Sequence, residues 1–415
     1  MTGSKIMIAG AGIGGLTTAL CLHARGIRCE VYEAAAAIKP LGVGINLLPH
    51  ASRVLCELGL EKELSTMAVE TSELIYYNRF GQKIWQEPRG KFAGYRWPQF
   101  SIHRGMFQML LLKEVKRRLG EHCVHAGMRL ESVSVRANAA AANFLYNDPA
   151  HGKASFEADA LIAADGIHSA VRRQFYPEEG LPVFSGIILH RGTSIVPSFL
   201  TGSSMIMAGS VRQKFVAYPI GQAENGQQRI NWVADLQVGK DGNIPPQDWN
   251  RKADKQQLLE AFANWTFSWM DVPGMIANAD SIYEFPMSDR DPLPQWSFGP
   301  ITLLGDAAHP MYPIGSNGAS QAILDAECIA QCLAASPDVS NAFRQYESIR
   351  LPATSNIVLR NREMGPERVM QLAEERAPNG FQNIYDIIPK EELEAIAARY
   401  KQVAGFDMNS VNQKK

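Results

Sequence analysis

The residues best suited to chemistry near the start of the chain are glycines with a characteristic spacing. Gly10, Gly12 and Gly15 form a GxGxxG pattern. In such a turn the first glycine allows a tight bend, the second lets the backbone approach a pyrophosphate, and the third lets a helix pack closely on a strand. The amide groups at the start of that helix favour a negatively charged ligand. The spacing predicts a nucleotide site formed by Gly10, Gly12, Ile13, Gly14 and Gly15, with a glycine turn that binds nothing as the alternative.

A single acidic residue stands at the expected distance from this turn. Glu33 follows Gly15 by 18 residues and ends an apolar stretch that begins at Arg28. A carboxylate in that position accepts hydrogen bonds from the ribose hydroxyls of a bound dinucleotide. The run KIMIA before the turn is apolar and suited to a strand, so strand, turn, helix and acid agree with one another. Together they favour a bound dinucleotide over an empty turn, without distinguishing FAD from NAD.

Two further pairs of glycine and aspartate each follow a short apolar run. Asp165-Gly166 comes after the run LIAA, and Gly305-Asp306 comes after the run ITLL. Both pairs are expected at the carboxyl ends of strands, which is the edge where open α/β sheets bind ligands. Taken singly, Asp165 is equally well explained as a turn residue and Asp306 as a helix N-cap. Like the first motif, each pair follows a predicted strand, and the occurrence of three such motifs in one chain favours a shared cofactor site.

Several residues resemble bases or metal ligands without forming a convincing site. His103 and His309 lie beside the motifs, but we expect each to pack or hydrogen-bond locally. Cys328 and Cys332 share a helix face and lack a second pair of ligands nearby. We predict no metal site.

The elements that must position these residues alternate along the chain. Strands are predicted over 5–9, 28–32, 161–164 and 301–304, and helices over 15–25, 104–119 and 318–334. Aromatic-rich, strand-like stretches separate them, and the last part of the chain is predicted as helical, with 409–415 frayed. The pattern predicts an α/β protein with a Rossmann-like cofactor domain (1–71, 101–182 and 285–345), an interleaved β-sheet substrate domain (72–100 and 183–284) and a C-terminal helical segment (346–415).

The overall composition excludes several classes of protein. Among 415 residues, 41 basic side chains balance 42 acidic ones, for a net charge of -1. A nucleic-acid-binding protein would show a basic excess, and an electrostatic membrane anchor a basic cluster. No run reaches the roughly 18 apolar residues that span a bilayer, the beginning lacks the layout of a signal peptide, and six scattered cysteines favour reduced thiols. We therefore expect a cytoplasmic monomer or homodimer that handles small molecules, with no nucleic-acid or membrane partner.

Taken together, the three motifs resemble those of one enzyme family. The set GxGxxG, DGxxSxVR (165–172) and GDAAHxxxP (305–313) is similar to that of the flavin aromatic hydroxylases of the para-hydroxybenzoate hydroxylase type. The resemblance covers nearly the whole chain and is strongest toward the branch of the salicylate and phenazine hydroxylases, through the segments 40–46, 99–105, 286–294 and 317–323. Two small residues, Ala163 and Ser316, stand where the family often has glycine.

The resemblance implies a cofactor and a set of contacts. It implies non-covalent FAD, NADH or NADPH as reductant, and O2, with a flavin C4a-hydroperoxide hydroxylating an electron-rich ring, with or without decarboxylation. By the resemblance Asp306 contacts the ribityl chain, and the loop around Gly42 lies beside the flavin. The implied FAD contacts are Gly10, Gly12, Ile13, Gly14, Gly15, Glu33, Gly42, Val43, Arg104, Asp165, Gly166, Gly305, Asp306, Pro313, Gly318 and Ala319.

Two further groups of residues are assigned to catalysis and to the substrate. Amide groups at the start of the helix from 318 can supply positive potential beside the flavin. The catalytic candidates are Pro313, Gly315, Asn317 and Gly318, and the candidates for a small aromatic substrate are Arg191, Met207, Phe215, Tyr218 and Trp232. Arg191 can bind a carboxylate bidentately, with a purely structural arginine as the alternative. His190 stands where the phenazine hydroxylases have an aromatic residue, which argues against a flat tricyclic substrate such as a phenazine and favours a smaller, salicylate-like aromatic acid or another heterocycle.

Two alternative functions are also compatible with the motifs, because a fold does not determine an activity. A halogenase or a reductase would use the same scaffold, although the Trp-x-Trp-x-Ile-Pro segment typical of flavin halogenases is absent from the sequence. A non-enzymatic, redox-sensing flavoprotein would bind FAD without converting any ring compound.

Overall fold

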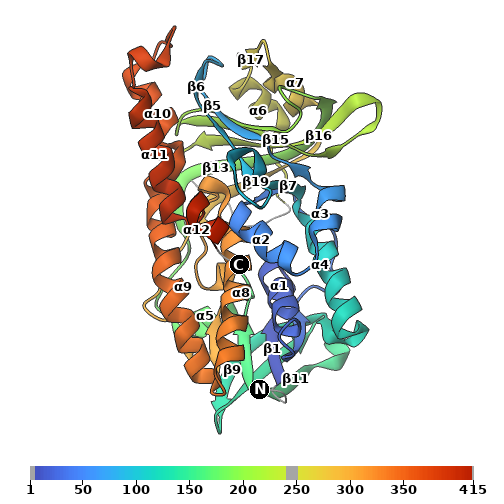
Figure 1. Cartoon of the computed structure of the whole chain (residues 1–415). Coiled ribbons are helices and arrows are strands. Elements are labelled where there is room, and N and C mark those ends of the chain that lie inside the picture. Colours follow the sequence, from blue (N-terminus) through green and yellow to red (C-terminus); the bar gives the residue numbers. More distant parts are fainter. Residues whose placement is uncertain (1–4, 240–250, 414–415) are drawn as a thin grey trace.

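A computed structural model of the chain describes residues 5–239 and 251–413. Figure 1 shows two large sheets, one toward each end of an elongated molecule, with the helices of the C-terminal third along one side. The predicted fold class, a Rossmann-like sheet with an interleaved β-sheet and C-terminal helices, is confirmed. The boundaries given above for the domains stay a prediction.

The first large sheet has six strands, and all of them run parallel except the edge strand β20. Its interior strands are buried and apolar, as expected where other elements cover both faces. The predicted strands over 5–9, 28–32, 161–164 and 301–304 are four of its members. In spatial order the strands are β20 (Ser297–Phe298), β21 (Ile301–Leu303), β12 (Ala160–Ala163), β1 (Lys5–Ala9), β2 (Arg28–Glu33) and β8 (Val124–Ala126).

The second large sheet has seven strands, and its neighbours are antiparallel except β14 and β5. Helices α6 and α7 pack on one face, whereas α10 and α11 pack over part of the other (Figure 1). In spatial order the strands are β19 (Ala279–Asp289), β13 (Val183–Pro197), β16 (Gln227–Gln237), β15 (Gln213–Gln222), β14 (Ser204–Gly209), β5 (Glu73–Tyr77) and β6 (Lys83–Pro88).

Three smaller sheets complete the strands. They are β11 (Lys153–Ala158), β10 (Ala139–Tyr146) and β9 (Met128–Arg136); β3 (Gly44–Leu47), β7 (Phe100–His103) and β4 (Val69–Glu70); and β17 (Thr266–Phe267) with β18 (Met270–Asp271). The sheet of β3, β7 and β4 matters most for the site, because it joins the loop around Gly42 to the start of α4.

The helices agree closely with the predicted ones, and α4 has the predicted bounds. They are α1 (Ile13–His23), α2 (Pro49–Glu57), α3 (Glu61–Met67), α4 (Arg104–Leu119), α5 (Ala170–Phe175), α6 (Lys255–Ala261), α7 (Val272–Ala277), α8 (Gly318–Ala335), α9 (Val339–Arg362), α10 (Arg368–Arg376), α11 (Lys390–Val403) and α12 (Met408–Gln413). The prediction of fraying from 409 is wrong as far as 413, because Val411 is buried in a cluster with Phe406; residues 414–415 lie outside the described ranges. No helix in the described ranges is both long and apolar enough to cross a membrane.

Candidate active site

The glycines of the turn between β1 and α1 fall into two groups, according to what a side chain at each position would meet. Gly10 has a φ of +105°, and a Cβ there would collide with the carbonyl oxygen of Ala164 on the neighbouring strand. A Cβ on Gly15 would collide with the carbonyl oxygen of Gly10. A Cβ on Gly12, by contrast, would meet no atom within 4 Å. Gly10 and Gly15 therefore serve the packing of the turn, whereas Gly12 keeps open the space in front of it.

Glu33 ties this turn to the end of β2. One carboxylate oxygen accepts a hydrogen bond from the Ala11 amide at 2.8 Å, and the other accepts one from the Ala35 amide at 2.7 Å. Each oxygen retains a lone pair for a further donor. The position is compatible with the predicted contact to a ribose, which stays a prediction.

The middle motif is joined to the third by its arginine. Asp165 accepts a hydrogen bond from the Ala170 amide at 2.8 Å, and burial raises the pKa of this carboxyl. Arg172 is 1 % exposed and donates to the carbonyl oxygens of Ala307 at 3.2 Å and Ala308 at 2.8 Å. The arginine of DGxxSxVR thus stabilises the turn that carries Asp306, a role that the sequence did not reveal.

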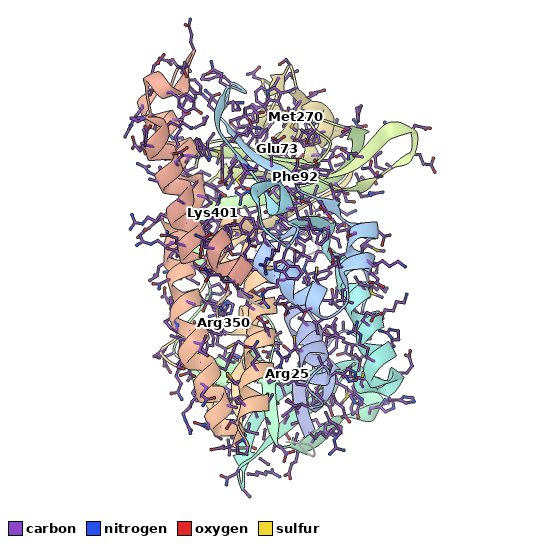
Figure 2. All side chains as sticks on the ribbon, viewed as in Figure 1. Arg25, Glu73, Phe92, Met270, Arg350 and Lys401 are labelled. Carbon is purple, nitrogen blue, oxygen red and sulfur yellow. The ribbon has the colours of Figure 1, made fainter. Side chains whose placement is uncertain are left out.

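A buried carboxylate holds the third motif from behind. Asp325 of α8 is fully buried and accepts hydrogen bonds from the Gly305 amide at 3.1 Å, from Nε2 of His309 at 2.6 Å and from Nε of Arg350 at 2.7 Å. Arg350, labelled in Figure 2, reaches Asp325 from α9. His309 therefore bonds locally, as predicted. His103 does so too, since its Nδ1 accepts a hydrogen bond from the Met106 amide at 3.3 Å and caps α4.

The loop around Gly42 is anchored on two sides. Gly42 has a φ of +101° and lies against the Arg104 side chain, and the Val43 carbonyl oxygen accepts a hydrogen bond from the Arg104 amide at 2.8 Å. The next residue, Gly44, donates to Oδ1 of Asn231 at 2.6 Å, which links the loop to the seven-stranded sheet. The loop predicted to lie beside a flavin therefore also contacts the sheet predicted to bind the substrate.

One cavity of about 340 Å³ joins the three motifs to the second sheet. The predicted cofactor and catalytic residues that line it are Gly12, Ile13, Gly14, Arg104, Gly166, Gly305, Asp306, Pro313, Asn317, Gly318 and Ala319. The residues predicted for the cofactor or for catalysis that are not among its lining residues are Gly10, Gly15, Glu33, Gly42, Val43, Asp165 and Gly315. Helices α1 and α8 both begin at this cavity, and no side chain caps either N-terminus.

This arrangement fits FAD. Free amide groups at the start of α1, in front of the open Gly12, suit a pyrophosphate. The uncapped start of α8 suits the part of a flavin on which negative charge develops. Two helix N-termini directed at one cavity need a ligand with two electron-rich groups, and a long dinucleotide that carries a flavin meets that need.

The C-terminal helices shape the turn before α8. Gly315 has a φ of +67°, and a Cβ there would collide with the Tyr400 ring. The Tyr400 hydroxyl accepts a hydrogen bond from Nδ2 of Asn317 at 2.8 Å and lies 2.8 Å from Oδ1 of Asn361, to which it can donate. Gly315 is thus required by packing, and α11 positions the residues that stand at the start of α8.

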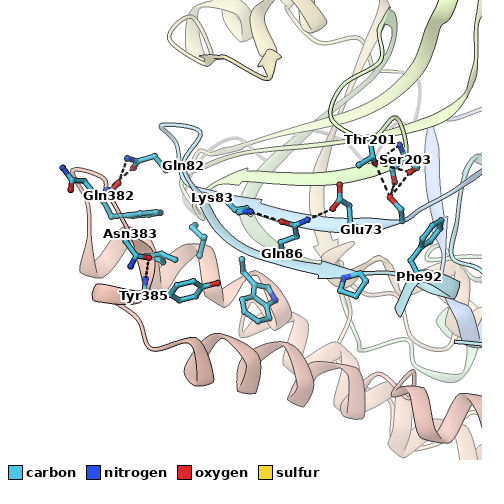
Figure 3. Close-up of a pocket in the computed structure, with 16 residues that line it drawn as sticks. Glu73, Gln82, Lys83, Gln86, Phe92, Thr201, Ser203, Gln382, Asn383 and Tyr385 are labelled. Atoms are coloured by element: carbon cyan, nitrogen blue, oxygen red, sulfur yellow. Dashed lines mark hydrogen bonds between the residues drawn. The ribbon is translucent and has the colours of Figure 1, made fainter. Parts of the chain in front are cut away.

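A larger hollow of about 1010 Å³ lies elsewhere, between the edge strand β6 and the segment 381–385 (Figure 3). Its polar side chains, such as Lys83, Gln86 and Glu73, bond to one another along the strands. None of the three motifs contributes a residue to it. We therefore place the chemistry in the smaller cavity.

Three of the five predicted substrate residues line the cavity, and two do not. Arg191, Met207 and Tyr218 face it from three strands of the seven-stranded sheet, β13, β14 and β15. Phe215 and Trp232 are fully buried on the opposite face, under α6 and α7, and this placement corrects their assignment as substrate contacts. Side chains alternate across a strand, so Phe215, three residues before Tyr218, must face the other way.

The same alternation shows which cavity residues the sequence missed. Lys214 and Val216 share the face of Tyr218, and Asp235 lies opposite Lys214 on β16. Counting back from Tyr218 in steps of two residues along the strand would have found Val216 and Lys214. Glu367, which also lines the cavity, comes from the C-terminal third of the chain and has no local signal.

Arg191 stands at the cavity without a partner. Among the described residues, none makes a hydrogen bond or an ion pair with its side chain, and its Nε is buried and unsatisfied. The guanidinium lies 5.6 Å from the centre of the Phe285 ring, and burial lowers the pKa of Arg191. The alternative of a structural arginine lacks the anion that such an arginine would pair with. His190 faces the other side of the sheet, 3.1 Å from the Ala234 carbonyl oxygen, so its identity does not limit the size of the substrate ring.

Comparison with known proteins agrees with this geometry. A family profile described as an FAD binding domain matches residues 4–361. Phenazine 1,6-dicarboxylic acid hydroxylase PhzS of Lysobacter antibioticus is 44% identical over 366 residues, covering 87% of this chain and 90% of that protein. 3-Amino-4-hydroxybenzoate 2-monooxygenase PtnB3 of Streptomyces platensis is 33% identical, covering 88% of each chain.

A solved structure shows the same fold over nearly the whole length. Klebsiella pneumoniae HpxO, complexed with FAD and uric acid, superposes with a TM-score of 0.73 at 21% identity, covering 99% of this chain and 97% of that one. The matched profile spans most of the chain, and the two curated enzymes match over 87% and 88% of it. The chain therefore belongs to the FAD-dependent aromatic hydroxylases and uses FAD as its cofactor.

Proposed function

We propose that this enzyme hydroxylates an aromatic or heteroaromatic acid, with NADH or NADPH as reductant and O2 as oxidant, and that Arg191 binds the carboxylate of the substrate. The observation that carries the proposal is the unpaired guanidinium of Arg191 at a cavity shared with the cofactor motifs. The two curated relatives act, by their names, on a phenazine dicarboxylic acid and an aminohydroxybenzoate, both of which are aromatic acids.

The residues that line the cavity have distinct roles in this reaction. FAD, when bound, supplies the electron transfer and the activation of oxygen. Arg191 fixes one end of the substrate by charge, while Met207 and Val216 provide an apolar surface for its ring. The amide groups at the start of α8 favour negative charge beside them. Pro313 and Ile314 line the same cavity from the third motif and exclude water from the region between cofactor and substrate.

The test is product formation by the purified holoenzyme. NADH and NADPH oxidation should be stimulated by a panel of aromatic acids, and mass spectrometry should find oxygen in the ring with the carboxyl group either retained or lost. Arg191→Gln should raise the KM for the acid by at least roughly 30-fold, the equivalent of about 2 kcal/mol for truncating a buried charge pair. Arg212→Gln, an exposed arginine on a turn of the same sheet, is the matched control.

Two results would count against the proposal. A reductant consumed without any oxygenated product, in an enzyme shown to hold FAD, would favour the reductase alternative. An unchanged KM in Arg191→Gln would remove the carboxylate anchor. We further propose a cytoplasmic monomer or homodimer, in keeping with the six free cysteines; size-exclusion chromatography with light scattering tests the oligomeric state.

A further inference from the structure

The end of the cavity away from the motifs holds a buried cluster of charges. Nζ of Lys214 on β15 lies 2.8 Å from Oδ2 of Asp235 on β16 and 2.6 Å from Oε2 of Glu367, in the turn before α10. The three residues are 9 %, 2 % and 4 % exposed, respectively. Burial acts to lower the pKa of Lys214, but the two carboxylates outweigh it and raise that pKa. Lys214 therefore stays charged and joins the two carboxylates.

One atom of this cluster is both buried and unpaired. Oδ1 of Asp235 accepts no hydrogen bond from any described residue, although Asp235 lines the cavity. A buried carboxylate oxygen without a donor costs free energy, so native proteins rarely keep one without a use. Because Lys214 holds Oδ2, the side chain cannot turn to exchange its two oxygens without losing an ion pair. The free acceptor is therefore held in one orientation.

Arg191 and Asp235 lie on the same face of adjacent strands. Arg191 pairs with Val233 across β13 and β16, and Asp235 is two residues further along β16. Residues in this diagonal relation have backbones about 7–8 Å apart, and the two side chains form no ion pair. A cation and an acceptor thus line the same cavity from adjacent strands.

We propose that Oδ1 of Asp235 accepts a hydrogen bond from a donor group on the ring system of the substrate, and so selects aromatic acids that carry a hydroxyl, an amino group, a ring N–H or a second, protonated carboxyl group. This inference rests on the proposed function, in which Arg191 binds the first carboxylate. Lys214 and Glu367 act as positioning residues, since Lys214 holds Asp235 through one ion pair and Glu367 holds Lys214 through another.

The test compares matched ligands on the FAD-loaded enzyme by titration of flavin absorbance or fluorescence. The pairs are 3-hydroxybenzoate against 3-methoxybenzoate, and 3-aminobenzoate against 3-(dimethylamino)benzoate. Wild-type enzyme should bind the donor-bearing member of each pair about tenfold to hundredfold more tightly, since one buried hydrogen bond to a charged group is involved. Equal affinities for both members of both pairs would overturn the inference without any variant.

The variant Asp235→Asn sharpens this test. Lys214 is a donor, so the amide oxygen must face Lys214 and the NH2 group must take the place of Oδ1. The acceptor becomes a donor, and the preference for 3-hydroxybenzoate over 3-methoxybenzoate should fall to about one or invert. Asp254→Asn, an exposed N-cap where aspartate and asparagine are interchangeable, is the control and should keep the preference.

The outcomes separate the two proposals. An unchanged preference in Asp235→Asn, with binding still weakened by Arg191→Gln, leaves the proposed function standing and makes Asp235 merely structural. Absence of binding by every acid, or indifference of binding to Arg191→Gln, defeats the proposed function itself. FAD content and thermal stability of Asp235→Asn are measured alongside, and the wild-type pairs decide the matter if that variant does not fold.

Discussion

Replacing Asp325 by asparagine should destabilise the protein far more than so small a change suggests. Both carboxylate oxygens are in use: one accepts from the Gly305 amide and His309, the other from Arg350. Asparagine replaces one oxygen by an NH2 group. Whichever way the amide is turned, that NH2 group faces a donor, either Nε of Arg350 or the amide of Gly305. The variant also leaves Arg350 as a buried cation without an anion.

The loss in the free energy of unfolding caused by Asp325→Asn can be worked out in two ways. Burial alone would raise the pKa of Asp325, but the His309 ring and the Arg350 guanidinium outweigh it and lower the pKa from 3.8 to about 2. That lowering is equivalent to about 2.4 kcal/mol of stability. Removing one partner of a buried ion pair costs about 3–5 kcal/mol. We therefore expect Asp325→Asn to lower the free energy of unfolding at pH 7 by about 2–5 kcal/mol.

The same pKa gives the pH dependence of this effect. The folded-state pKa lies below the unfolded one, so the contribution of Asp325 is complete above about pH 4 and is lost as the pH falls toward 2. Urea unfolding of the apoprotein, followed by circular dichroism, should show a gap between wild type and variant that is largest at neutral pH and narrows below pH 4. Asp338→Asn is the control, because this exposed N-cap accepts either residue. A gap smaller than about 1 kcal/mol at pH 7, or one that widens on acidification, would refute the reasoning.

Four further substitutions test other parts of the structure. Gly12→Ala should weaken FAD binding in a flavin titration and leave the melting temperature of the apoprotein unchanged, because the new Cβ meets only open space. Gly10→Ala should lower that melting temperature in calorimetry, because its Cβ collides with backbone atoms. Trp232→Phe should cost about 1–3 kcal/mol in urea unfolding by leaving a gap in the core and leave the KM for aromatic acids unchanged. Gly315→Ala should strain a left-handed turn and displace Tyr400, seen as a higher Kd for FAD in fluorescence titration.

Much of the fold could be predicted because its signals are local. The glycine turn with its flanking strand and helix depends on residues within about ten positions of one another, and the helix over 104–119 shows its apolar face directly in the sequence. The cofactor residues at the cavity follow from these elements, since the carboxyl ends of parallel strands share one edge.

The substrate face could not be predicted in the same way. Strand β15 is buried on both faces over most of its length, so the alternation of apolar and polar residues that would orient it is missing. Phe215 and Tyr218 are both aromatic, and composition alone gives no reason to prefer either. Glu367 and Asp325 contribute through contacts that are long-range in sequence, and such contacts leave no trace in local periodicity.

The strand order of the six-stranded sheet has a consequence for the synthesis of the chain on the ribosome. Strand β1 can pair with β2 soon after both emerge, but its other edge pairs with β12, which begins at Ala160. At about 5–20 residues per second, the intervening stretch takes roughly 8–30 s to make. During that interval the edge of β1 is open to pairing with other nascent chains. The strand that leads into the cofactor turn is thus made long before its second neighbour, and that edge must be shielded in the meantime to avoid pairing between nascent chains.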